Sequence, residues 1–311
     1  MEPHISIVIV TYNRLEKLKK TLSCYSKQTD SFRELIVVDN CSTDGTQEFL
    51  DNWKNRKESF LKFVLHMDTN IGGSGGFYEG EKFALSLKPD WIYVADDDAY
   101  ATENMIAVFK EFLKKNSNED YSAISGAVVN VDGSISLDHR SNVIYKDGYK
   151  FEKIHSTEEQ YKLEKFEIDC FSYVCTFMNA EKMQKVGLCN PNYFIYFDDT
   201  EHSLRLREVG KIVCVPSIKI IHDGGGIIAI KDNNVLTTWR DYYSVRNQMN
   251  MLVKRNKKSA LYFFVQTFKR KWIRYKFSYS SMKLIMSALL DGMLNRLGIH
   301  SIYKPGFSIN K

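Results

Sequence analysis

Three adjacent aspartates, Asp96, Asp97 and Asp98, are the residues whose types and spacing most directly predict chemistry. Adjacent carboxylates repel one another unless a cation or strong hydrogen-bond donors lie among them. They follow a predicted strand, 91–95, in which alternate residues point to the same side. We therefore expect Asp96 and Asp98 to converge on Mg²⁺ or Mn²⁺, because hard oxygen ligands favour these cations. The alternative is a solvated acidic turn before the helix that follows Thr102.

A second acidic cluster, Asp198, Asp199 and Glu201, offers a general base that could deprotonate a hydroxyl group. The same residues suit the N-terminus of a helix, and taken alone the cluster favours that structural interpretation. His222 ends another apolar segment and precedes three glycines, 224–226. A lone histidine more often has a structural role, but a flexible glycine run would let a loop close over a ligand held by this one.

A glycine-rich segment, 72–76, follows Asn70 where a strand is predicted to lead into a helix. Glycine lets backbone amides approach a ligand closely, so we interpret these residues as a turn before a helix over 77–87. The spacing matches neither the GxGxxG fingerprint nor a Walker loop. The dinucleotide and ATP motifs of those two types are therefore excluded.

The elements that would position these residues alternate along the first hundred positions. Four segments are predicted to be strands: 5–10, 35–38, 61–65 and 91–95. The first of them is a continuous apolar run of β-branched residues broken only by Ser6, which is the pattern of a buried parallel strand. Residues with helical spacing lie between them, and Thr43 or Asp44 would cap the second helix. This order is typical of the α/β class, with a mainly parallel central sheet and helices on both faces.

Polar clusters follow three of the four predicted strands, at 11–14, 39–40 and 96–98. In parallel sheets of this kind, ligands bind beyond the carboxyl ends of the strands. The coincidence of the three clusters at one edge predicts a binding site there.

The second half of the chain is less regular. We expect strands over 123–131, 166–178, 212–215 and 218–221, and helices over 183–186 and after Asp198. From Trp239 onward the sequence predicts helices.

The basic residues are unevenly distributed along the chain. The net charge is +5, yet the segment 242–290 contains no Asp or Glu and holds many Lys and Arg residues, among them Arg246 and Arg270. Alternating aromatic and basic clusters are typical of helices on an anionic membrane surface, where each Lys or Arg contributes about 1 kcal/mol. The alternatives are basic helices packed on the core, a dimer contact, or a nucleic-acid patch.

The composition is that of an ordinary globular protein, with 44% hydrophobic and 26% charged residues. None of the six cysteines forms a CxxC pair, so neither a zinc site nor a redox pair is indicated. No signal peptide and no run of about 18 apolar residues is found. We therefore expect reduced thiols and a cytoplasmic location.

Taken together, these segments resemble the inverting glycosyltransferases of family 2, which have the A-type (GT-A) nucleotide-binding fold. The segments that carry the resemblance occur in family order: 6–14, 37–46, 96–98 and 196–207. A narrower resemblance, to bacterial galactofuranosyltransferases that use UDP-galactofuranose, rests on 70–77, on the triple aspartate and on the position of His222. Rhamnosyltransferases share much of the general pattern.

The resemblance implies a role for each matching residue. Asp96, Asp98 and His222 would bind Mn²⁺ or Mg²⁺, and Asp97 would lie against the donor sugar. Asp199, the second member of the family's acidic pair, would be the catalytic base. The residues expected to contact the nucleotide part of the donor are Thr11, Arg14, Asp39, Asn40 and Asn70. Tyr173, in the aromatic segment before the base, would face the acceptor.

The resemblance also implies a domain organisation. A GT-A catalytic domain would span 1–235, with its nucleotide-sugar half at about 1–100 and its acceptor half at about 101–235. The remainder, 236–311, would be a basic helical C-terminal extension. The expected location is peripheral, on the inner face of the bacterial plasma membrane, and no nucleic-acid partner is expected.

The implied reaction is a single displacement that moves galactofuranose from a UDP-sugar to a polysaccharide or a lipid-linked oligosaccharide. A rhamnosyltransferase or another hexosyltransferase is the alternative within the family. A non-catalytic module that binds nucleotide-sugar or nucleic acid is the alternative from another class, although it would have no use for Asp199. A nucleotidyltransferase fits poorly, because 11–14 is not a glycine-rich basic loop.

Overall fold

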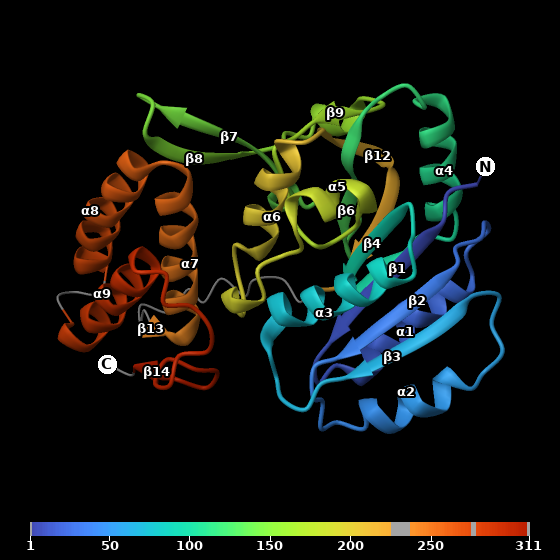
Figure 1. The fold of residues 1–311 in the computed structure, drawn as a ribbon, viewed down its shortest axis with the longest axis horizontal. Helices are drawn as coiled ribbons and strands as arrows, with labels where there is room; N and C mark the ends of the chain where they lie inside the picture. The colour runs from blue at the N-terminus through green and yellow to red at the C-terminus, as the bar shows by residue number, and fades with distance from the viewer. Residues whose placement is uncertain (1, 225–236, 275–277, 310–311) are drawn as a thin grey trace.

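The computed structural model describes residues 2–224, 237–274 and 278–309 (Figure 1). Four strands agree with those predicted for the first hundred residues: β1 (Ile5–Thr11), β2 (Glu34–Asp39), β3 (Leu61–His66) and β4 (Trp91–Asp96). They are parallel neighbours in the order β3-β2-β1-β4. β1 and β2 are buried along their whole length, as their continuous apolar sequences require.

The sheet continues beyond β4 in a mixed pattern. β11 (Thr176–Asn179) is antiparallel to both β4 and β6 (Tyr121–Asn130). β12 (Lys211–His222) is parallel to β6, and β5 (Ala99–Ala101) closes the order β4-β11-β6-β12-β5. The expected α/β class with a mainly parallel central sheet is confirmed.

Two predictions about the later strands are wrong. The segment 166–178 is three short strands, β9 (Phe166–Glu167), β10 (Cys170–Phe171) and β11, because the chain turns between them and Cys175 has φ 61°. The segments 212–215 and 218–221 are one strand, β12, with a register shift between Val215 and Lys219. Pro216 lies at that irregularity, and proline cannot donate a hydrogen bond to a strand ladder.

Helices cover both faces of the sheet, as predicted. One face carries α1 (Leu15–Ser26), α2 (Thr46–Lys54) and α4 (Met105–Lys115), and the other carries α3 (Gly72–Ser86), α5 (Ala180–Val186) and α6 (Asp198–Arg207). Three short 3₁₀ turns connect the later elements: Leu137–His139, Pro191–Tyr193 and Gln160–Lys162. A separate small sheet has the order β10-β7-β8, with β7 (Arg140–Lys146) and β8 (Lys150–His155) forming a hairpin.

The glycine-rich segment belongs to α3, which begins at Gly72 and not at 77 as predicted. A Cβ atom on Gly76 would lie 2.6 Å from Val10 Cγ1, and one on Gly80 would lie 2.3 Å from Val8 Cγ1. The glycines therefore let the helix approach β1 more closely than a side chain would permit.

The cap of α2 also differs from the prediction. Gly45, with φ 89°, occupies the N-cap position that was expected for Thr43 or Asp44. The Asp44 carboxylate accepts hydrogen bonds from the backbone of Thr46 and of Leu15, so it joins the starts of two helices.

Three C-terminal helices pack together at one end of the molecule: α7 (Trp239–Arg255), α8 (Lys257–Arg274) and α9 (Tyr279–Met293) (Figure 1). A two-stranded ribbon, β13 (Thr237–Thr238) with β14 (Ser308–Ile309), lies beside them. The predicted boundary at 235/236 and the glycines at 225 and 226 lie outside the described residues.

Candidate active site

The structure brings together the three residues predicted to bind a metal. Asp96 ends β4, Asp98 follows in the turn into β5, and His222 ends β12 beside β5. One ligand atom from each lies within 4.8 Å of the other two. Asp98 Oδ1 is buried without a hydrogen-bond partner among the described residues, and lies 3.2 Å from His222 Nε2. Two carboxylates, one of which holds this unsatisfied oxygen, and one imidazole fit a divalent cation.

The electrostatics of the cluster also favour a cation. Burial, reinforced by repulsion from Asp98 and Asp97, raises the pKa of Asp96 to about 7. Burial opposes ionisation of Asp98 too, but the neighbouring imidazole of His222 and the guanidinium of Arg14 outweigh it and lower the pKa of Asp98. A cation among these carboxylates would relieve the repulsion that disfavours the ionised form of Asp96.

Asp97 is joined to the loop between β1 and α1. Its carboxylate accepts a hydrogen bond from Thr11 Oγ1 (2.7 Å) and another from Arg14 Nη1 (3.2 Å). Arg14 also donates to Asp98 Oδ2 at 2.7 Å. We call Asp96, Asp98 and His222 the metal cluster, after their predicted role. The structure places Thr11, Arg14 and Asp97 beside it, and their contacts with a donor remain predictions.

Asn40 follows β2 directly, Asn70 lies just before α3, and the two residues hold the start of α3. Asn40 Nδ2 donates to Asn70 Oδ1 (3.1 Å) and to the Gly72 carbonyl (3.0 Å). Asp39 is completely buried, and one of its carboxylate oxygens lies 3.1 Å from His66 Nδ1. These residues shape the carboxyl edge of the sheet, and their predicted role in nucleotide binding is untested.

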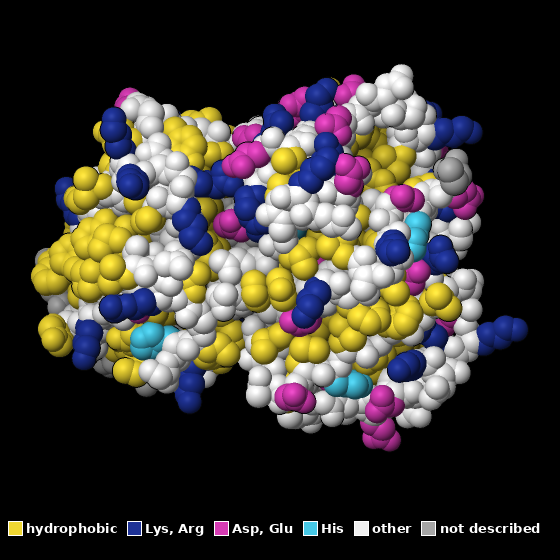
Figure 2. Space-filling model, in the orientation of Figure 1, with side chains coloured by type: hydrophobic (Ala, Val, Ile, Leu, Met, Phe, Trp, Pro, Cys, Tyr) yellow, Lys and Arg dark blue, Asp and Glu magenta, His cyan; other side chains and the backbone are white. Residues whose placement is uncertain are grey.

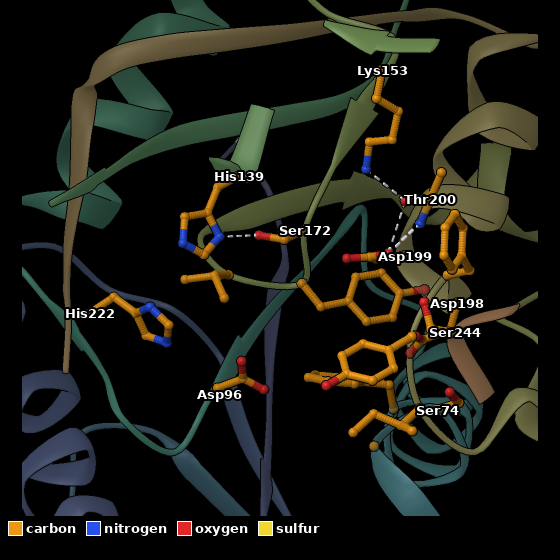
Figure 3. Close-up of a pocket in the computed structure, with 17 residues that line it drawn as sticks. Ser74, Asp96, His139, Lys153, Ser172, Asp198, Asp199, Thr200, His222 and Ser244 are labelled. Carbon is orange, nitrogen blue, oxygen red and sulfur yellow. Dashed lines mark hydrogen bonds between the residues drawn. The ribbon is translucent and has the colours of Figure 1, made fainter. Parts of the chain in front are cut away.

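A cavity of about 480 Å³ lies between the metal cluster and the start of α6 (Figure 3). Asp96 and His222 line one side of this reaction cavity, and Asp199 lines another. Asp199 and Asp96 are more than a hundred positions apart in the sequence. Their presence in one cavity is a result of the tertiary structure, and it gives the cavity carboxylates on two of its sides.

Asp199 is held by its own helix. Its Oδ1 accepts a hydrogen bond from the backbone N–H of Thr200 (2.5 Å), and Thr200 Oγ1 accepts one from Lys153 Nζ (3.0 Å). Figure 3 shows the Asp199 carboxylate directed toward the cavity. Glu201 is bonded to Arg205 at 2.8 Å and has the structural role expected near a helix N-terminus. Asp198 also lines the cavity, and burial together with repulsion from Asp199 raises the pKa of Asp198 to about 7. Asp198 and Asp199 are therefore the members of the acidic cluster that line the cavity, and the predicted role of Asp199 as the base stays a prediction.

The loop before Asp199 has an unusual backbone. Phe194, Tyr196 and Phe197 have φ values of 68°, 68° and 65°, a region that residues other than glycine rarely occupy. Asn247 on α7 donates hydrogen bonds to the carbonyls of Tyr193, Ile195 and Tyr196. The helix α7 therefore holds this loop in the conformation that directs Asp199 into the reaction cavity.

Arg246, the neighbour of Asn247 on α7, also holds this loop, and the two residues are called the α7 clamp. The position of Arg246 corrects the prediction that it belongs to a basic surface. It was counted among the basic residues for an anionic surface, but it is 1% exposed. Its guanidinium donates to the carbonyls of Gly298, Asn192 and Tyr193. Sequence reasoning missed both Arg246 and Asn247 as site-forming residues. The available signal was a group of polar residues, Arg246, Asn247 and Asn250, among the apolar residues of one helix.

A second histidine of the cavity was also missed. His139 lines the reaction cavity, and its Nδ1 lies 2.7 Å from Ser172 Oγ. Burial, together with the nearby charges of Arg140 and His222, lowers the pKa of His139 to about 3. Its imidazole is therefore neutral at physiological pH. No pattern in the sequence around 139 indicates this position.

Tyr173, predicted to face the acceptor, belongs mainly to the core. It borders the cavity, but it is 4% exposed and its hydroxyl lies 2.6 Å from Nδ1 of the buried His202. Glu81 lies in the same buried group, and its Oε2 accepts a hydrogen bond from the Cys189 backbone. Burial raises the pKa of Glu81 to about 7. This polar group supports the wall behind the reaction cavity.

The fold is that of the A-type glycosyltransferases. Among solved structures, that of GalNAc-T7 with UDP, GalNAc and Mn²⁺ superposes on this chain with a TM-score of 0.62 at 15% identity. The superposition covers 94% of this chain and 56% of GalNAc-T7. At that identity, the likeness establishes the fold.

The chain belongs to the family described as Glycosyl transferase family 2, whose profile matches residues 6–187. It is 31% identical over 140 residues to galactofuranosyltransferase GlfT1 of Mycobacterium tuberculosis, a match that covers 44% of this chain and 43% of that protein. It is 28% identical over 261 residues to the dTDP-rhamnosyl transferase RfbF of Shigella flexneri. The second match covers 82% of this chain and 81% of RfbF.

Proposed function

We propose that this protein is a metal-dependent, inverting glycosyltransferase that transfers galactofuranose from UDP-galactofuranose to a polysaccharide or lipid-linked oligosaccharide. The observation that carries the proposal is the reaction cavity, which has Asp96 and His222 on one side and Asp199 on another. The identity to GlfT1 and the triple aspartate support galactofuranose as the sugar.

Asp96, Asp98 and His222 would hold Mn²⁺ or Mg²⁺. When bound, the ion supplies positive charge that stabilises the diphosphate as it leaves. Arg14, bonded to Asp97 and Asp98, adds a fixed positive charge beside the same position. The chain's own contribution at this side of the cavity is thus a charged pocket for the nucleotide diphosphate.

Asp199 acts as the general base in this proposal. It accepts the proton of an acceptor hydroxyl while that oxygen attacks the anomeric carbon of the donor sugar. The bond between the anomeric carbon and the UDP oxygen breaks on the opposite side, so the configuration inverts in one step. Asp199 lines the same cavity as Asp96 and His222, which supports binding of the acceptor and the donor side by side.

Transfer of rhamnose from dTDP-rhamnose is the second candidate. The match to RfbF is lower in identity, but it covers 82% of this chain, compared with 44% for GlfT1. It therefore includes much of the half that would bind the acceptor.

The test is nucleotide release from purified protein supplied with UDP-galactofuranose, dTDP-rhamnose or other UDP-sugars, and with glycan or lipid-linked acceptors. We expect release from one donor, dependent on Mn²⁺ and abolished by EDTA. Asp199→Asn should reduce it at least about 10³-fold, while Glu208→Gln, an exposed residue just after the same helix, should leave it unchanged. Donor binding without turnover under all conditions would instead indicate a non-catalytic binding module.

We further propose that the C-terminal helices dock on an anionic membrane surface. Leu261, Ile273 and Tyr279 are 67%, 63% and 80% exposed. Lys257 and Lys258 are exposed near Leu261 in the sequence. Figure 2 shows hydrophobic side chains gathered with basic ones over the end of the molecule formed by α8 and α9. In the described part of the chain, no helix is long and apolar enough to span a bilayer.

Cosedimentation with vesicles tests the docking. We expect binding to phosphatidylglycerol vesicles at low salt and little binding to phosphatidylcholine vesicles, because the attraction to the basic helices is electrostatic. Equal recovery in the supernatant with both lipids would contradict it.

A further inference from the structure

A second cavity of about 480 Å³ lies next to the reaction cavity, between β8 and the helices α7 and α8. We call it the side groove. The residues that define its character are Phe151 and Lys153 from β8, Gln248 from α7, and Ser259, Gln266 and Arg270 from α8. Nearly all of these side chains are polar or charged, which distinguishes the groove from an apolar docking surface.

The side groove is adjacent to the reaction cavity. Lys153 lines both cavities. On α7, Ser244 lines the reaction cavity and Gln248 lines the side groove. These two residues are four positions apart in a helix and therefore lie on the same face. A molecule that extends from Asp199 along this face of α7 would enter the side groove.

The walls of the side groove are held together by specific contacts. Asn256 Nδ2 donates a hydrogen bond to the Gly148 carbonyl in the β7–β8 hairpin (3.1 Å). The rings of Tyr149 and Tyr262 pack edge to face with centroids 5.4 Å apart. The hairpin and α8 therefore form a defined site between them.

The charge in the side groove is positive. Lys150 is paired with Asp147, and Glu152 is paired with a lysine of the same hairpin, so these charges are compensated. Lys153 and Arg270 make no ion pair with any residue that the structure describes. Lys153 instead donates to a neutral hydroxyl, that of Thr200. Two uncompensated cations in one groove would stabilise an anionic ligand.

A buried hydroxyl provides a second, independent observation. Ser259 lines the side groove and is 1% exposed, yet its Oγ has no hydrogen-bond partner among the described residues. A buried polar group left without a partner carries an energetic penalty, because it has lost its hydrogen bonds to water. A ligand oxygen in the groove would remove this penalty. The amides of Gln248 and Gln266 offer further donors and acceptors of the type that bind sugar hydroxyls.

We propose that the side groove binds the acceptor, and that the acceptor carries a phosphate ester held by Lys153 and Arg270. This inference rests on the proposed function, because it takes Asp199 as the point where the acceptor hydroxyl reacts. Ser259, Gln248 and Gln266 bind the sugar units next to the phosphate, and the ring of Phe151 lies against a sugar face. The phosphate belongs either to a lipid-linked diphosphate or to a glycan phosphate.

The experiment measures binding by calorimetry in EDTA without donor, so that the metal and nucleotide sites do not contribute. The probes are one disaccharide in three forms: a neutral methyl glycoside, a 1-phosphate and a farnesyl diphosphate. We expect both phosphorylated forms to bind at least about tenfold more tightly than the neutral form, in keeping with charge-assisted hydrogen bonds. Arg270→Gln should remove this preference. Lys269→Gln, which changes the neighbouring exposed charge on the same helix, should retain it.

The outcomes distinguish the two sources of the phosphate and test whether the side groove binds a phosphorylated acceptor. Equal affinity for the 1-phosphate and the farnesyl diphosphate assigns the site to a phosphate ester as such, and tighter binding of the farnesyl form assigns it to a lipid-linked diphosphate. No preference for the phosphorylated forms, or equal losses in Arg270→Gln and Lys269→Gln, overturns the proposal. Because no donor is present, such a failure is distinct from an absence of nucleotide release, which would overturn the transferase function itself.

Discussion

Replacing Glu81 by glutamine is expected to remove a large part of the pH dependence of stability. Glu81 is completely buried in α3, and its Oε1 has no hydrogen-bond partner among the described residues. Burial raises its pKa from 4.5 to about 7. Glutamine resembles the protonated acid in shape and can still accept the hydrogen bond from the Cys189 backbone. The substitution therefore removes the titration while it preserves the packing.

The sign and size of this pH effect on the free energy of unfolding follow from the pKa of Glu81 in the folded and in the unfolded chain. Between pH 4.5 and 7 the folded protein retains a proton that the unfolded chain has released. The free energy of unfolding of the wild type therefore falls as pH rises through this window and is level above it. At about 1.4 kcal/mol for each pH unit, the fall attributable to Glu81 is about 3 kcal/mol. Glu81→Gln lacks this fall, so the variant gains about 3 kcal/mol relative to the wild type between pH 4.5 and pH 8.

The assay is urea denaturation followed by tryptophan fluorescence at pH 4.5, 6 and 8. Other groups titrate equally in both proteins, so the difference between the two unfolding free energies isolates Glu81. Glu79→Gln is the matched control, since Glu79 lies on the same helix and its side chain is 35% exposed beside Lys82. A wild-type-minus-variant difference that stays constant from pH 4.5 to 8 would show that Glu81 does not titrate as a buried acid.

Three further predictions concern the predicted metal ligands, the packing of α3 on the sheet, and the hold of α7 on the loop before Asp199. His222→Ala removes one of three convergent ligands, and its Mn²⁺ affinity by calorimetry should fall at least about tenfold; an unchanged affinity would place the metal elsewhere. Gly80→Ala should destabilise the fold by about 1–3 kcal/mol in thermal melts because its Cβ would overlap Val8. Gly73→Ala, with open space at the Cβ position, should not. Asn247→Ala should lower kcat more than donor KM, since it releases the loop before the base, and an unaltered kcat would refute this positioning role.

Much of the nucleotide half could be predicted from the sequence. The segments 5–10, 35–38 and 91–95 are short apolar runs, and they form buried strands of the parallel part of the sheet. The segment 61–65 forms the edge strand β3, where Leu61 is 57% exposed. The polar residues after three of these four strands were expected at one edge, because parallel strands share their carboxyl ends. Asp96 and Asp98 were expected to converge because they are two positions apart, and their ligand atoms do lie close together.

The acceptor half could not be predicted to the same extent. The aromatic segment 166–178 is mainly apolar, and its periodicity did not show that it divides into three strands in two sheets. The glycines at 72–76 were interpreted as a turn, but they belong to a helix. At Gly76 the need for glycine comes from close packing against Val10, and a local sequence pattern does not contain that distance.

The sequence by itself determined the kinds of element and the chemistry at the strand ends, because hydrophobic periodicity and residue type act over a few positions. Only the tertiary structure decided which distant residues share a cavity. It placed Asp199 in the same cavity as Asp96, and it used Asn247 of α7 to hold the loop before the base. It also joined Lys153 and Arg270 in one groove. These contacts depend on how helices and hairpins pack, and packing is decided by the whole chain.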